Sequence, residues 1–130
     1  MLGGVGRVEE EVVVGRYVIS FDDGAMVVAD GELEAVSAAT MAVVREAQGA
    51  GVWVFGGGLG SQPTAVVGVD GAVSDGPIPA GKAVLGGFCI VDVASRGEAL
   101  EWAGKFAAAC RCAQEVREFL PGSETAGGLQ

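Results

Sequence analysis

The segment Leu85–Val93 predicts a strand that is apolar on both of its faces. Successive side chains of an extended chain point to opposite sides, so Phe88 would lie on one face and Cys89 on the other. Residues 17–21 and 52–55 predict two further strands of the same kind. A strand face in contact with water is ordinarily polar, so a sheet made of these strands needs cover on both sides. Within the three strands, one set of alternating positions holds Tyr17, Ile19, Trp53, Phe55, Phe88 and Ile90, and the other holds Val18, Val52, Val54, Cys89 and Val91.

Two segments between the strands have the composition and spacing of helices. Residues 31–48 are rich in Ala, Leu, Val and Met, with apolar positions three and four residues apart. Ser95, followed three residues later by Glu98, predicts a capping box at the start of a second helix that runs to about residue 109. The expected apolar stripes are Leu33, Val36, Thr40, Val43, Val44 and Ala47 in the first helix, and Leu100, Ala103 and Ala107 in the second.

The order of the remaining elements indicates the fold class. Residues 64–74 predict a hairpin around an Asp70-Gly71 turn, and residues 114–119 predict the last strand. The order β-α-β, hairpin, β-α-β indicates an α+β fold of the ferredoxin-like type, an antiparallel sheet with two helices on one face. Because two helices cover only one side of the sheet, we expect a second copy of the chain to cover the other and form a homodimer.

Composition and charge exclude several classes of protein. At 130 residues the chain is one domain by size. It has no stretch near the roughly 20 unbroken apolar residues of a bilayer helix, and residues 1–15 lack the pattern of a secretion signal. We therefore expect a soluble, cytoplasmic protein with no membrane association. The net charge is −9, and the 8 Lys and Arg residues are scattered singly, which argues against direct nucleic-acid binding.

The sequence lacks the residues that usually form metal sites, nucleotide sites and nucleophile-base pairs. The chain has no histidine, and its three cysteines include no CxxC pair, so a zinc site is not expected and the cysteines are interpreted as reduced apolar residues. Without histidine, neither a Ser-His-Asp nor a Cys-His scheme is available. The glycine-rich residues 56–60 are not followed by the Gly-Lys-Ser/Thr of a phosphate loop. We expect no cofactor.

Residues 74–103, SDGPIPAGKAVLGGFCIVDVASRGEALEWA, form an ordered string of short motifs. The string resembles the signature of the YCII-related proteins of the DGPF type, and the closing residues 114–120, QEVREFL, resemble that family's last strand. The order of the predicted helices and strands agrees with that of the family over residues 16–120, which we interpret as the domain. Residues 1–15 are then a tail or loose strand, and residues 121–130 a disordered tail. The matching positions are Asp75, Gly76, Pro77, Lys82, Leu85, Gly86, Gly87, Phe88, Asp92, Val93, Glu98, Ala99, Leu100, Glu101, Trp102, Ala103, Glu115, Val116 and Arg117.

The resemblance implies a ferredoxin-like protomer whose sheets pair across a dimer into an α+β barrel that encloses a cleft. Members of the family have been suggested to be enzymes, with a carboxylate and in some a histidine near the cleft. Their genes often lie beside genes for extracytoplasmic-function sigma factors, which suggests a regulatory role. Two departures matter, because Ile78 replaces the Phe of the four-residue motif and the histidine is absent.

The candidate catalytic residue is Asp75, as a general acid or base in an apolar cleft. An Asp before Gly-Pro can also serve only to form a turn. Lys82 could bind an anionic group of a ligand or be a solvated surface charge, and Asp92 could assist Asp75.

The aromatic residues Tyr17, Trp53 and Phe88 are core by default, but would select flat or apolar ligands if they lined the cleft. Gly86-Gly87, within a strand, predicts a bulge or a close backbone approach.

Two functions fit these features. The first is a cofactor-independent lyase or isomerase that acts on a small organic molecule, with Asp75 as the acid or base. The second is a non-catalytic ligand-binding or regulatory protein, such as a partner of an extracytoplasmic-function sigma factor. The missing histidine favours the second, whereas the doubly apolar sheet and the motif favour the first.

Overall fold

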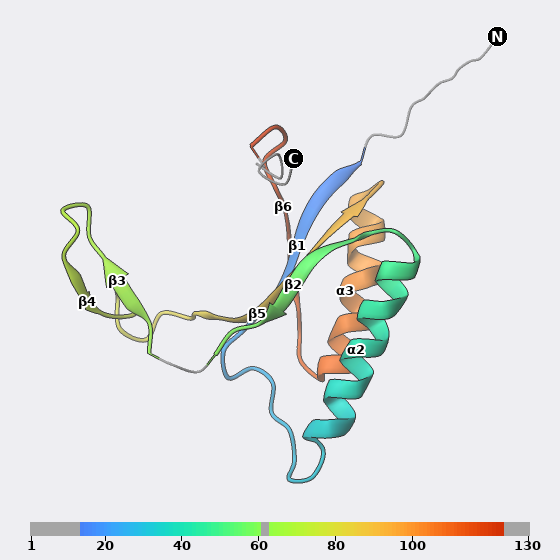
Figure 1. Ribbon diagram of the computed structural model, residues 1–130, viewed down its shortest axis with the longest axis horizontal. Helices are drawn as coiled ribbons and strands as arrows, with labels where there is room; N and C mark the ends of the chain where they lie inside the picture. The colour runs from blue at the N-terminus through green and yellow to red at the C-terminus, as the bar shows by residue number, and fades with distance from the viewer. Residues whose placement is uncertain (1–13, 61–62, 124–130) are drawn as a thin grey trace.

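The computed structural model describes residues 14–60 and 63–123, and these form an α+β fold. A four-stranded antiparallel sheet has the strand order β2-β5-β1-β6, and two helices pack against one of its faces (Figure 1). This arrangement confirms the predicted ferredoxin-like fold. The elements are β1 (Gly15–Asp22), α2 (Leu33–Gly49), β2 (Trp53–Gly58), β3 (Ala65–Val67), β4 (Val73–Asp75), β5 (Leu85–Val93), α3 (Arg96–Cys110) and β6 (Glu115–Glu118).

The two predicted tails fall mostly outside the described residues. Residues 1–13 of the expected leading tail and residues 124–130 of the expected closing tail are not among them. Gly15, the last residue of the segment expected to be a tail or loose strand, is the first residue of β1. Within the described residues, no helix is both long enough and apolar enough to cross a membrane.

Strand β5 lies in the middle of the sheet and alternates as its sequence predicts. Cys89 and Val91 are buried beneath the helices, whereas Phe88 and Ile90 point to the other face and are only half-buried. The neighbouring strand β1 follows the same alternation, since Ile19 pairs with Cys89. The hydrophobic core therefore lies between the sheet and the two helices.

Strand β2 departs from simple alternation. Trp53 pairs with Val91, but Phe55 pairs with Ile90, so the register shifts by one residue between them. This bulge turns the two rings to opposite faces. Trp53 faces the helices with its ring centroid 6.3 Å from that of Phe106. The expectation that Trp53 and Phe55 share a face is therefore wrong.

The face of the sheet that points away from the helices, here called the open sheet face, remains apolar in its centre. The ring of Phe55 is 6.3 Å from that of Phe88, and Phe55 is 61% exposed. Val18 and Ile90 pair on adjacent strands of this face. At its edge, the Arg16 guanidinium donates two hydrogen bonds to the Asp92 carboxylate, at 2.6 and 2.7 Å. The open sheet face is thus an apolar centre next to a paired charge.

Helix α3 begins at the predicted cap. The Ser95 hydroxyl accepts a hydrogen bond from the Glu98 backbone N–H at 3.1 Å, and the Glu98 carboxylate accepts one from the Ala94 N–H at 3.1 Å. The predicted apolar stripe was misplaced, however, because Leu100 is 43% exposed. The buried side of α3 carries Ala99, Trp102, Ala103, Phe106, Ala109 and Cys110.

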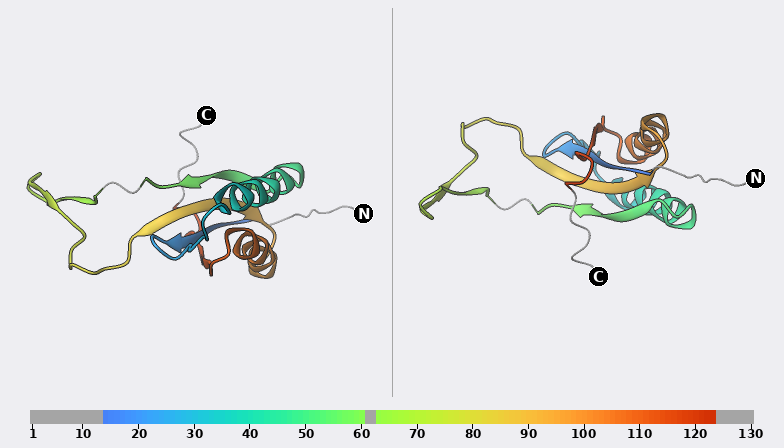
Figure 2. Two further views of the ribbon diagram at one scale, coloured as in Figure 1. Left: turned by 90° about the horizontal axis from the view of Figure 1, so that it is seen from below. Right: turned by 90° about the horizontal axis from the view of Figure 1, so that it is seen from above.

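Strands β3 and β4 form a hairpin arm, residues 65–75, that extends away from the sheet and the helices (Figures 1 and 2). Its loop has three residues rather than the two expected. The Gly71 N–H donates to the Gly68 carbonyl, the Gly68 N–H donates to the Ala72 carbonyl, and Gly71 has a φ of +86°. A positive φ after the turn is typical of a three-residue hairpin loop with a bulge, which explains the glycine at that position.

Gly56 is required by the close approach of β2 to β5. A Cβ at Gly56 would lie 2.6 Å from the Cys89 Cβ and 2.7 Å from the Phe88 carbonyl oxygen. We expect Gly56→Ala to lower the free energy of unfolding by about 2 to 3 kcal/mol, because the two strands must separate. The matched control is Gly57→Ala, whose Cβ would meet nothing within 4 Å and should change stability by less than about 0.5 kcal/mol. Urea denaturation measures both, and equal stabilities would contradict this account of the β2–β5 contact.

Candidate functional site

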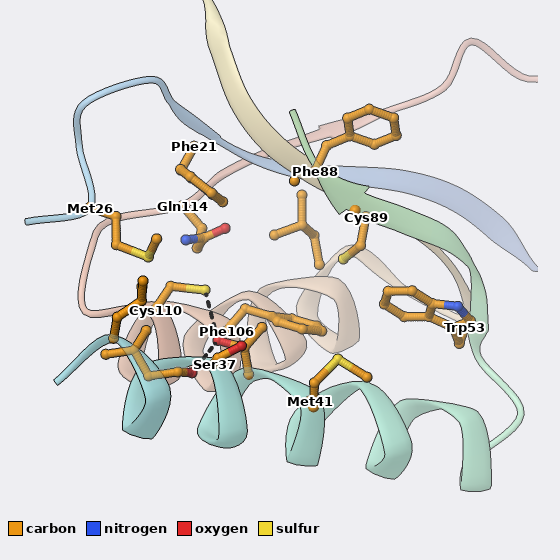
Figure 3. A pocket seen from close by; sticks show the side chains of 16 residues that line it. Phe21, Met26, Ser37, Met41, Trp53, Phe88, Cys89, Phe106, Cys110 and Gln114 are labelled. Atoms are coloured by element: carbon orange, nitrogen blue, oxygen red, sulfur yellow. Dashed lines mark hydrogen bonds between the residues drawn. The ribbon is translucent and has the colours of Figure 1, made fainter. Parts of the chain in front are cut away.

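A pocket of about 310 Å³ lies between helix α2 and the helix-covered face of the sheet (Figure 3). Helix α2 is tied to β2 at its C-terminal end, where the Val52 N–H donates to the Ala47 carbonyl at 3.1 Å. Nearer its N-terminus, only Val36 of the helix is buried, so the helix does not fill the space above the sheet. The pocket, here called the α2 pocket, is lined by Ile19, Phe21, Met26, Leu33, Val36, Ser37, Thr40, Met41, Trp53, Gly57, Gly58, Phe88, Cys89, Phe106, Cys110 and Gln114.

Among the described residues, the wall of the α2 pocket carries no Asp, Glu, Lys, Arg or His side chain. Most of it is aliphatic, aromatic or thioether surface. Its polar groups are the hydroxyls of Ser37 and Thr40, the amide of Gln114 and two thiols. An apolar cavity with a few polar groups is the usual form of a small-molecule site.

The side chains of Thr40 and Cys110 form a hydrogen bond with each other inside the pocket. The Thr40 hydroxyl donates to the Val36 carbonyl at 2.9 Å, and its oxygen lies 3.5 Å from the Cys110 sulfur. Because the single hydroxyl proton is used by Val36, the Cys110 thiol is the donor of the second bond. Both groups therefore already have hydrogen-bond partners within the protein.

The Gln114 amide is only partly satisfied. Its Nε2 donates to the Cys112 carbonyl at 3.3 Å and contacts the Cys112 sulfur at 3.6 Å. These two contacts fix which end of the amide is nitrogen, and the Oε1 atom points toward the pocket (Figure 3). Within residues 14–60 and 63–123, Oε1 accepts no hydrogen bond, so it is an acceptor available to a ligand.

Cys89 is a neutral thiol at the bottom of the pocket. Burial raises the pKa of its thiol from 9.0 to about 12, and the neighbouring Cys110 adds to the rise. Burial also raises the pKa of Cys112, which is more accessible. Thiolate is the nucleophilic form, so neither the depth of Cys89 nor its pKa suits a nucleophile near neutral pH.

The raised pKa of Cys89 predicts a loss of stability in alkali. Between pH 9 and about 12, the thiol ionises in the unfolded chain while it stays protonated in the folded one, so stability falls as pH rises. We expect the free energy of unfolding of the wild-type protein to fall more steeply than that of Cys89→Ala, by up to about 1.4 kcal/mol per pH unit. Denaturant titrations at pH 9 and pH 10.5 measure the two slopes, and equal slopes would show that the thiol is not buried.

The predicted site residues do not meet at one place. Asp75 is exposed at the end of the hairpin arm, and its carboxylate accepts no hydrogen bond from the described residues, so it shows no turn-forming contact. Lys82 is exposed in the loop before β5. Asp92 pairs with Arg16 at the open sheet face. None of these three charged residues lines the α2 pocket.

The three aromatic candidates are also separated. Tyr17 is buried in the core, whereas Trp53 lines the α2 pocket. Phe88 contributes to the wall, but its ring points away from the pocket, toward the open sheet face (Figure 3). Of the predicted ligand-binding residues, Trp53 alone directs its side chain at the pocket.

Sequence reasoning missed Phe21, Thr40 and Gln114 as pocket residues. One signal for Phe21 was present in Gly86-Gly87, because a Cβ at Gly87 would lie 2.8 Å from the Phe21 ring. The pairing of β1 with β5 skips Gly86, which is the bulge that the two glycines predict. The glycines thus allow the Phe21 ring to lie against the strand at the pocket wall.

A metal centre is absent from the part of the chain that the structure describes. No group of three or more His, Cys, Asp or Glu side chains is placed there to hold an ion.

Comparison with known proteins gives one family. The model of the YCII-related domain matches residues 15–121, which include every described helix and strand. A search of curated proteins finds no match. The matched range covers most of the 130 residues, and its fold is the one described above. The chain belongs to the YCII-related family.

Proposed function

We propose that this protein binds a small organic molecule in the α2 pocket and acts as a homodimer. The observation that carries the proposal is the pocket itself, about 310 Å³ of mostly apolar space between α2 and the sheet. Its volume is within the range of roughly 300 to 1,000 Å³ that ligand sites occupy. No cofactor is needed for this function.

The homodimer is supported by the open sheet face. Its centre exposes apolar side chains from three adjacent strands, and both helices found in residues 14–60 and 63–123 lie on the opposite face of the sheet. A stable interface buries at least roughly 1,200 Å² in total, so the proposal requires that two copies pair across most of this face. The residues that we assign to the interface are Val18, Phe55, Phe88 and Ile90.

Two roles for the bound molecule can be distinguished. Non-catalytic binding is supported by the wall of the α2 pocket, whose described residues include no ionisable group except two thiols. Catalysis of the lyase or isomerase kind would depend on Asp75, which is carried on the hairpin arm, away from the pocket of its own protomer. We therefore propose ligand binding as the primary function and acid or base catalysis by Asp75 as the second candidate.

A fragment screen by ligand-observed NMR tests the proposal. Gly58 lines the pocket, pairs with Gly87 and has no atom within 4 Å of an added Cβ, so Gly58→Leu should fill the pocket without a clash. We expect the wild-type protein to bind a set of apolar fragments that Gly58→Leu does not bind. The control is Gly104→Leu on the exposed side of α3, where an added Cβ also meets nothing. If the Gly58→Leu variant keeps every fragment, the ligand site lies elsewhere.

A further inference from the structure

We infer that the ligand of the α2 pocket is an uncharged, mostly apolar molecule about the size of two fused rings, which donates one hydrogen bond to the Gln114 Oε1 atom. This inference rests on the proposed function, because it names the chemical class that the same pocket would select. Three properties of the pocket carry it: the charge of its wall, its volume, and the hydrogen-bonding capacity that remains free.

The charge of the wall excludes ionised ligands. None of the lining side chains that the structure describes is charged, and the whole chain has a net charge of −9. A carboxylate or phosphate moved into such a pocket would lose its hydration and gain no cation in return, which costs several kcal/mol. Lys82, the cation suggested by the sequence for an anionic ligand, lies outside the pocket. The wall thus selects neutral molecules.

The volume and shape of the pocket set the size of the ligand. A cavity of about 150 Å³ is enough to hold benzene, and the α2 pocket is about twice that volume at 310 Å³. Apart from Phe88, whose ring points away, the aromatic lining residues are Phe21, Trp53 and Phe106. Two flexible methionines, Met26 and Met41, can adapt to a ligand edge. Flat rings are well matched to such walls.

The hydrogen-bonding groups determine which polar group the ligand needs. The Thr40 hydroxyl donates its proton to the Val36 carbonyl, and the Cys110 thiol donates its proton to the Thr40 oxygen, so neither group can donate a hydrogen bond to a ligand. Apart from the exposed Ser37 hydroxyl, the acceptor that remains among the described lining residues is the Gln114 Oε1 atom. A ligand with a hydroxyl or N–H group can satisfy it, whereas a purely apolar ligand leaves it without a partner when water is displaced. The Ser37 hydroxyl at the exposed side of α2 can accept water or a second polar group.

Three probes of equal ring size test the inference by isothermal titration calorimetry: 2-naphthol, naphthalene and 2-naphthoate. We expect 2-naphthol to bind at least about 10-fold more tightly than 2-naphthoate, because the anion must be desolvated. In Gln114→Leu, the preference for 2-naphthol over naphthalene should fall by roughly 3- to 10-fold, which is the effect of one hydrogen bond. The quantity compared is the ratio of the dissociation constants of naphthalene and 2-naphthol in each protein. The difference in hydrophobicity between the two probes is the same in both proteins, so it cancels when the two ratios are compared. Gln48→Leu, on the exposed part of α2, is the matched control and should leave the ratio unchanged.

The outcomes separate this inference from the proposed function. Binding of 2-naphthol that is lost in Gly58→Leu and weakened in Gln114→Leu supports both. Binding of 2-naphthoate as tight as that of 2-naphthol, or a ratio unchanged in Gln114→Leu, overturns the ligand class and leaves the pocket as a binding site. Binding of none of the three probes, or binding unaffected by Gly58→Leu, contradicts the pocket itself. Melting temperatures of both variants near that of the wild type show that the pocket was tested in folded protein.

Discussion

Ile90→Asp is expected to convert the proposed homodimer into monomers of 13.0 kDa. Ile90 lies at the centre of the open sheet face, where it pairs with Val18 on one side and Phe55 on the other. A carboxylate at this position would have to be desolvated against an apolar partner surface, which costs several kcal/mol. The dissociation constant should therefore rise at least about 100-fold, as measured by sedimentation equilibrium at micromolar concentration.

The matched control is Leu100→Asp. Leu100 is also a large apolar residue in partial contact with solvent, but it lies on the outer side of α3, away from the open sheet face. This variant should stay dimeric, and circular dichroism should show that both variants are folded. A wild-type protein that sediments as a monomer would end the dimer proposal. An Ile90→Asp dimer would mean that the copies meet through another surface.

Asp75→Asn is expected to lower the rate of any turnover by roughly 100-fold or more if Asp75 is the acid or base. The substitution keeps the shape of the side chain and removes the transferable proton. Because the Asp75 carboxylate is exposed and accepts no hydrogen bond from the described residues, stability should change by less than about 0.5 kcal/mol. Ligand binding in the α2 pocket should be unchanged, since Asp75 is not among the lining residues.

Asp70→Asn is the control for this experiment, because it makes the same chemical change on the same hairpin arm. The Asp70 carboxylate accepts a hydrogen bond from the Ala72 N–H at 2.9 Å, a contact that Asn can also make. This variant should keep full activity. Equal activity of Asp75→Asn and the wild type would exclude the catalytic role and leave the protein as a ligand-binding one.

The sequence predicted the fold where local rules decide the outcome. The alternation of Leu85–Val93 placed Cys89 and Val91 on the buried face, and Ser95 with Glu98 marked the start of α3. Both signals depend on residues within a few positions of each other, so they can be read without a structure. The open sheet face followed from the same alternation combined with the two helices that the sequence predicts.

The predictions from sequence were wrong where strand register or helix packing decides which face of the sheet or helix a side chain lies on. The bulge that separates the faces of Trp53 and Phe55 depends on the pairing of β2 with β5 and has no local signature. Helix α3 is rich in alanine and glycine, so its apolar residues fit more than one stripe, and the helix turned Trp102 rather than Leu100 toward the core.

The α2 pocket could not be predicted for a related reason. It depends on the distance between α2 and the sheet, and it combines residues that are remote in sequence, such as Phe21, Thr40 and Gln114. The sequence candidates were chosen by chemistry instead, which favoured charged residues such as Asp75 and Lys82. Those residues lie on the hairpin arm and the loop that follows it.

The most direct test of the central claim uses the three isoleucines of the chain, Ile19, Ile78 and Ile90. Ile19 lines the α2 pocket, Ile90 lies on the open sheet face, and Ile78 is exposed in the loop after the hairpin arm. In protein labelled at the isoleucine methyl groups, a bound ligand should shift the Ile19 signal and show nuclear Overhauser effects to that methyl alone. Effects at Ile90 or Ile78 with an unchanged Ile19 signal would contradict ligand binding in the α2 pocket.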